Sequence, residues 1–240
     1  MLKHLAQSTA NTLTTNMTKG RLLTRFFRPL AAAGLVGVAL QASALLAQSA
    51  ASPFTPPAVP FKLEVPEGNT LFQKGEAKGT QNYVCAPSAT SASGFAFKLF
   101  TPEATLFLPL NFTGNDYTHQ IITHFFSPNP NPDDNGAIRA TWQSSLDTST
   151  VWAATVPDGA STESPFVREG AVAWLLLQAK GTQRGPTGGE NLSQTTFVQR
   201  LNTDGGVAPK TGCSQPEHLG ATAFVPYTAD YYFYKATPKP

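Results

Sequence analysis

Short stretches of alternating hydrophobic and polar residues recur along the chain after residue 60, separated by glycine, proline and asparagine. Side chains alternate between the two faces of a strand, so this pattern predicts β-strands. No long stretch after the first 50 residues shows the 3.6-residue period of a helix. We expect about ten strands, at residues 61–65, 71–73, 80–85, 95–100, 119–126, 138–143, 150–155, 171–179, 195–201 and 224–234.

These strands predict an all-β, single-domain protein, either a β-sandwich or a β-barrel, with long loops. Residues 171–179 are apolar on both alternating faces, which favours a strand covered on both sides and leaves a short helix as the alternative. In an extended 195–201 segment, Arg200 points away from Phe197 and Leu201.

The alternation also assigns faces in two other segments. If residues 119–126 form one unbroken strand, His124 shares a face with Ile122, and Ile121 lies on the opposite face with His119. In the last strand, one face carries Asp230, Tyr232 and Tyr234, whereas the other carries Tyr231 and Phe233.

The N-terminal part of the chain differs from the rest. Its first 50 residues contain positive but no negative charges, and residues 29–40 are apolar. This pattern predicts a secretory signal peptide over residues 1–50, cleaved between Ala44 and Ala51, with Met17 as a possible true start. Residues 51–60 are rich in proline and predict an extended linker, so that residues 61–236 form the single β domain.

The leader determines the expected location of the protein. Its apolar run is short for a membrane span of roughly 20 residues. We therefore expect an exported domain, periplasmic or extracellular, with no stable membrane span after cleavage. The alternative is a domain that an uncleaved leader tethers to the membrane.

Charge excludes one class of partner. Beyond residue 50, twelve Lys and Arg stand against fifteen Asp and Glu, so the remaining net charge is about −3 with His neutral. This part of the chain also lacks a basic stripe or a basic helix, and nucleic acid is not an expected partner.

Cys85 and Cys213 are the only cysteines. An even pair in an exported chain predicts a disulfide, and the alternative is a redox or metal role, for which a C-x-x-C spacing is missing. Residues 131–136 resemble the start of a calcium loop, but Trp142 stands where a bidentate Glu is required. We expect neither a metal nor a cofactor.

The familiar hydrolase motifs are absent, which favours a non-catalytic domain. Arg200 is expected to form an ion pair with Asp230 or Glu103, or else to bind an anionic ligand. The competing hypothesis is an enzyme in which His124 acts as acid or base, Glu103 or Asp230 orients it, and Arg200 holds the substrate.

Aromatic residues are the candidates for ligand contact. Trp142, together with the face that carries Tyr232 and Tyr234, predicts a ligand wall, although aromatic residues also fill sheet cores. The leading hypothesis is an exported domain that binds a small molecule, a glycan or a component of the cell envelope. A third hypothesis is a structural or interaction domain without a pocket.

Six sequence blocks occur in an order that resembles a known family, namely residues 83–85 (YVC), 102–104 (PEA), 174–177 (WLLL), 199–209 (QRLNTDGGVAP), 212–213 (GC) and 225–234 (VPYTADYYFY). Together they are similar to the exported bacterial and fungal family known as domain of unknown function 3455, over roughly residues 61–235. The resemblance implies a secreted single-domain protein with its two cysteines in matching places. It implies no activity, cofactor or substrate.

Overall fold

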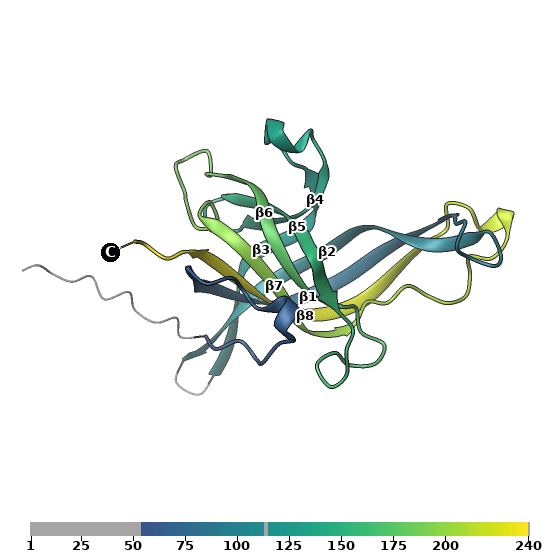
Figure 1. Ribbon diagram of the computed structural model, residues 1–240, viewed down its shortest axis with the longest axis horizontal. Coiled ribbons are helices and arrows are strands. Elements are labelled where there is room, and N and C mark those ends of the chain that lie inside the picture. Colours follow the sequence, from purple (N-terminus) through teal and green to yellow (C-terminus); the bar gives the residue numbers. More distant parts are fainter. Residues whose placement is uncertain (1–53, 113–114, 240) are drawn as a thin grey trace, which may run out of the picture. The chain divides into compact units, whose positions relative to one another are not determined.

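The computed structural model describes residues 54–112 and 115–239, which fold as an eight-stranded antiparallel barrel (Figure 1). Each strand pairs with the next along the chain, and the last pairs with the first. The strands are β1 (Asn69–Pro87), β2 (Phe95–Phe112), β3 (Asn115–Pro128), β4 (Ile138–Ser144), β5 (Thr150–Ser161), β6 (Trp174–Gln183), β7 (Thr195–Gly205) and β8 (Thr222–Ala236).

The predicted all-β fold is confirmed, and of its two forms the barrel is correct and the β-sandwich is wrong. Strands β1 and β8 pair from Asn69 opposite Ala236 to Val84 opposite Thr222. This pairing joins the two edges of the sheet, so that one sheet closes instead of two sheets stacking.

Eight strands replace the ten that we expected, partly because the strands at 71–73 and 80–85 are both parts of β1. The intervening residues, KGEAKG, lack hydrophobic alternation and contain two glycines. A Cβ atom on Gly79 would lie 2.0 Å from the carbonyl oxygen of Glu103 on β2. Gly79 therefore permits a close backbone approach that the sequence pattern does not reveal.

The strand expected at residues 61–65 is wrong. Phe61–Leu63 forms a 3-10 helix, η1, in which the Leu63 amide donates to the Pro60 carbonyl at 2.8 Å. Leu63 is fully buried, whereas Phe61 is the most exposed of the large hydrophobic side chains in the described residues. The hydrophobic residues of this segment alternate, but only Leu63 is buried, in a helical turn and not in a half-buried strand.

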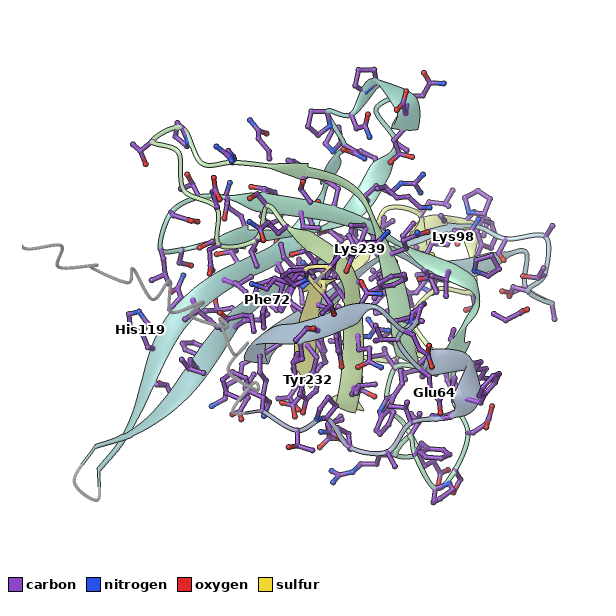
Figure 2. All side chains as sticks on the ribbon, turned by 60° about the vertical axis from the view of Figure 1, so that its left-hand side comes forward. Glu64, Phe72, Lys98, His119, Tyr232 and Lys239 are labelled. Carbon is purple, nitrogen blue, oxygen red and sulfur yellow. A yellow bond between two sulfur atoms is a disulfide. The ribbon has the colours of Figure 1, made fainter. Side chains whose placement is uncertain are left out.

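A β-bulge interrupts the face assignment in β3. The register with β2 shifts between the pairs Leu106–Ile122 and Phe107–Gln120, which leaves Ile121 as the extra residue. Ile121 and Ile122 are consequently both buried, whereas His119 is exposed (Figure 2). The expected face of His124 is unaffected, because it lies beyond the bulge.

Two hydrophobic cores lie on opposite faces of the barrel wall. The inner core includes Leu106, Ile122, Trp142, Val198 and Phe233. The outer core lies against β6, β7 and β8, which contribute Trp174, Leu201, Tyr232 and Tyr234. It is covered by the N-terminal segment, residues 59–65, through Val59 and Leu63, and by residues 166–171 through Val167. Val59 lies in the predicted linker, so the end of that segment packs against the barrel. The predicted signal peptide lies outside the described residues.

The predicted disulfide between Cys85 and Cys213 is confirmed. It ties the end of β1 to the connection between β7 and β8, where the Gly220 amide also donates to the Cys85 carbonyl at 3.0 Å. The disulfide therefore holds the connection between β7 and β8, residues 206–221, against the C-terminal end of β1. None of the helices in the described residues is long and apolar enough to span a membrane.

Removing the disulfide should weaken the fold. The bond closes a loop of 128 residues, for which the chain-entropy model gives up to about 5 kcal/mol. We expect a Cys85→Ala/Cys213→Ala variant to lose most of this free energy of unfolding in urea titrations. A loss below about 1 kcal/mol would contradict the assigned role, and the wild-type protein with reduced, alkylated cysteines serves as the chemical control.

Gly79→Ala should destabilise the barrel by about 1–3 kcal/mol, because the new methyl group meets backbone atoms of β2 that have little freedom to move. Gly75→Ala, in the same strand, is the matched comparison, since the three atoms nearest to its methyl group all belong to the side chain of Leu106 and none is closer than 2.9 Å. Chemical denaturation of the two variants should rank Gly79→Ala as clearly the less stable. Equal free energies of unfolding for the two variants would contradict the close approach of the β2 backbone to Gly79.

Candidate functional site

A cavity of about 590 Å³ opens at one end of the barrel interior. Every strand contributes to its wall, and residues 171–173 and 207–208, which lie outside the strands, also line it. Most of the wall is apolar or aromatic. The polar and charged side chains that line it are Gln81, Tyr83, His124, Arg139, Thr155, Thr162, Arg200 and Tyr231, and no Asp or Glu is among the described lining residues.

An aromatic cluster stands in this cavity. His124 on β3 and Trp142 on β4 are directly opposite in the register, and their rings stack 4.4 Å apart at an interplanar angle of 5°. The ring of Tyr231 on β8 tilts against both, at 5.2 Å from His124 and 5.5 Å from Trp142. Three separate strands thus fix one aromatic surface, which is rigid because its members are buried.

His124 is neutral at ordinary pH. The residue is only 3% exposed, and Nδ1 lies 2.8 Å from the Thr141 carbonyl, to which it can only donate. Burial lowers the pKa of His124 to about 3; the hydrogen bond to Thr141 opposes this shift, and the positive charge of Arg200 adds to it. With Nδ1 protonated, Nε2 carries the free lone pair.

Arg200 projects from β7 to the inner face of the barrel, where Val198 and the paired Tyr231 also lie. Its Nε and Nη2 atoms both donate to the Ala173 carbonyl, at 3.1 and 2.9 Å. The expected ion pair with Asp230 or Glu103 is not formed. No carboxylate of the described residues lies within 4.0 Å of the guanidinium, so a half-buried cation faces the cavity without a counter-ion.

The second arginine of the cavity differs from Arg200 in this respect. Arg139 donates from Nε and Nη2 to both carboxylate oxygens of Asp134, at 2.7 and 2.6 Å. The hydrogen bond from Arg139 lowers the pKa of Asp134, so the carboxylate stays ionised. The charge of Arg139 is therefore compensated within the protein.

One buried hydrogen-bond donor of the wall, Trp142 Nε1, has no partner among the described residues, and Trp142 is only 1% exposed. Gln81 is equally buried and lies within hydrogen-bonding reach of the Tyr227 hydroxyl. The tyrosine hydroxyls are better satisfied, since Tyr83 donates to the Gly206 carbonyl at 2.6 Å and Tyr227 and Tyr231 share a hydrogen bond of 3.3 Å. Unpaired buried donors are uncommon and invite a ligand or a water.

The structure separates the residues that the sequence nominated. His124, Trp142 and Arg200 meet in the cavity, whereas Tyr232 and Tyr234 lie on the outer face of β8. Tyr234 donates to Gln199 Oε1 at 2.6 Å, and Gln199 donates to the Leu63 carbonyl at 2.7 Å. These tyrosines hold the N-terminal segment on the barrel (Figure 2 marks Tyr232).

The two candidate carboxylates are also outside the cavity. Asp230 lies on the outer face, 3.3 Å from Lys74 Nζ and 2.9 Å from Asn202 Nδ2. Glu103 is exposed and lines a second pocket, of about 560 Å³, which His124 also lines. Neither carboxylate orients the His124 ring, because the Thr141 carbonyl occupies Nδ1.

The sequence did not nominate Gln81, Leu175, Leu177 or Tyr231, which are among the residues that line the cavity. The alternation in β8 did place Tyr231 with Phe233 on one face, and this signal would have found Tyr231. Gln81 gives no such signal, because a polar residue in the expected strand 80–85 would be assigned to a solvent-facing position. Within residues 54–112 and 115–239, no three His, Cys, Asp or Glu side chains are placed to hold a metal ion.

Comparison with known proteins agrees with the resemblance seen in the sequence. No curated protein and no solved structure matched the chain. The family model described as protein of unknown function (DUF3455) matches residues 66–235, which is more than half of the chain and spans β1 to β8 except for the last residue of β8. The chain therefore belongs to the DUF3455 family of proteins of unknown function.

Proposed function

We propose that this protein is an exported, non-catalytic domain that binds a small, largely apolar molecule inside its barrel. The observation that carries the proposal is the cavity of about 590 Å³, which falls within the range of roughly 300–1,000 Å³ typical of small-molecule sites. Its wall combines apolar side chains with a few polar groups. Such a wall supplies affinity through burial and orientation through hydrogen bonds.

The nature of the wall favours an apolar molecule over a glycan. A sugar needs an accessible aromatic face and many polar partners. The three tryptophans are buried, and of these only Trp142 lines the cavity. Tyr232 and Tyr234, the other expected stacking residues, are buried in the outer core. A ligand with an apolar body is therefore better matched to this site.

Export is part of the proposal and rests on two features. The leader has the charge and hydropathy of a signal peptide. The disulfide between Cys85 and Cys213 persists only where the environment is oxidising. Both features fit the periplasm or the extracellular space, where a binding domain would meet envelope components or free small molecules.

The enzyme hypothesis has weaker support. A general acid or base requires a partner that tunes it and a position beside the substrate. His124 faces the cavity, but both candidate carboxylates lie outside that cavity's wall, and burial holds the ring in its neutral form. The domain without a pocket has less support still, because the cavity is present.

Binding should be detectable with N-phenyl-1-naphthylamine, a neutral apolar dye that fluoresces when it leaves water. We expect saturable uptake of one dye per protein, and we expect Ala140→Phe, which places a ring in the cavity, to weaken binding about tenfold or more. Ala236→Phe adds the same ring at an exposed position of β8 and should bind as the wild type does. Absence of dye uptake by the folded wild-type protein would refute the proposal.

The neutral state of His124 predicts how stability depends on pH. The folded-state pKa of about 3 lies below the unfolded value of about 6.5, so between these values the unfolded state binds more protons. The stabilisation is complete above about pH 6.5 and falls as the pH decreases towards 3, by about 1.4 kcal/mol per pH unit.

The test compares urea midpoints between pH 4.5 and 7.5. His124→Phe should flatten the acid slope of the unfolding free energy, because the titrating group is removed while an aromatic ring remains against Trp142. His119→Gln changes an exposed histidine of the same strand and should keep the wild-type slope. A His124→Phe slope equal to that of the wild type would contradict the buried neutral state.

A further inference from the structure

We propose that the molecule bound in the barrel carries an anionic group, a carboxylate in particular, and that Arg200 binds this group. The inference rests on the proposed function, and it specifies the chemical class of the ligand. It would make the protein selective for small amphipathic acids over neutral molecules with the same apolar body.

The first reason is an uncompensated charge. Arg200 is half-buried, and its guanidinium donates to the Ala173 carbonyl and lies within hydrogen-bonding reach of the Tyr231 hydroxyl, neither of which carries a negative charge. A carbonyl oxygen satisfies two of the five donors of the guanidinium but carries no formal charge. Leaving a charge partly desolvated and unpaired is unfavourable, and a bound anion would remove that penalty.

The second reason is that no other group of the cavity supplies a negative charge. The described lining residues include no carboxylate, and the nearby Arg139 is already neutralised by Asp134. Burial raises the pKa of Tyr231 and of Tyr83, and the positive charge of Arg200 only partly offsets this rise. Both hydroxyls therefore remain neutral at ordinary pH, so the cavity keeps one net positive charge.

The third reason is the shape of the Arg200 side chain. Its guanidinium carries five N–H hydrogens, and only Nε and Nη2 donate to the Ala173 carbonyl. The remaining hydrogens suit a ligand with two acceptor atoms in one plane. A carboxylate has two such oxygens, and its geometry matches the planar fork of arginine.

The remaining surface of the cavity accounts for the other half of the ligand. Leu175 and Leu177 on β6 and Ala153 on β5 are apolar, and with Trp142 they provide a surface for a hydrocarbon chain. An acid with a short or medium hydrocarbon body therefore fits both the charge and the wall.

The experiment measures displacement of the neutral dye by octanoate and by octan-1-ol at pH 7.5, where octanoate is ionised. Wild-type protein should bind octanoate about 10- to 100-fold more tightly than octan-1-ol, as expected for hydrogen bonds to a charged group. Arg200→Gln should bring this ratio close to one while octan-1-ol still displaces the dye. Octyl sulfate and octyl phosphate, run in parallel, distinguish a carboxylate site from a site for other acidic heads.

Two further variants control the result. Arg168→Gln removes an exposed positive charge that pairs with Asp204 and should leave the ratio unchanged, which controls for net charge. Arg200→Lys keeps the charge without the planar fork and should retain an intermediate preference, and it serves as the folded variant if Arg200→Gln is unstable. Thermal unfolding establishes that each variant is folded.

The outcomes separate the two proposals. Equal affinity of the wild type for octanoate and octan-1-ol would overturn the anion inference and leave the small-molecule site intact. An unchanged octanoate preference in Arg200→Gln would overturn the role of Arg200. Failure of the wild type to take up the neutral dye would overturn the proposed function, and the anion inference with it.

Discussion

The backbone pairing of β1 with β8 is the interaction on which the rest of this structure depends. It runs from Asn69 opposite Ala236 to Val84 opposite Thr222, and it brings the first and last strands of the sheet together. Without this pairing the sheet would have two exposed edges and no enclosed interior. Closure creates an inside, and the cavity exists because one end of that inside is not filled by side chains.

Closure also gives neighbouring residues of one motif opposite roles. Tyr231 points inward and joins the ring cluster of His124 and Trp142, whereas Tyr232 points outward and is covered by the N-terminal segment. The same division separates Arg200 from Leu201 on the paired strand. Two cores on opposite faces of β7 and β8 thus stabilise the wall from both sides. This support from both sides allows a charged side chain to be held in a fixed position inside.

Sequence patterns predicted the features that depend on local periodicity. They located the strands β4 and β5, the disulfide, and the face of Arg200. They failed where contacts between distant parts of the sequence determine the structure. Leu63 is buried because it packs into the outer core, and β1 continues through Gly79 because the backbone of β2 lies against it. Alternation assigned Tyr231 and Tyr232 to opposite faces but could not tell which face the barrel would enclose.

The charge state of the cavity bears on how such a site would select its ligand. Burial keeps His124 neutral down to about pH 3, and burial raises the pKa of Tyr231, so neither group changes its charge near neutral pH. A guanidinium stays protonated throughout this range. The protein therefore presents the same single positive charge from mildly acidic to mildly alkaline conditions. Any pH dependence of binding would then report the ionisation of the ligand, and a weak acid would be bound above its own pKa and released below it.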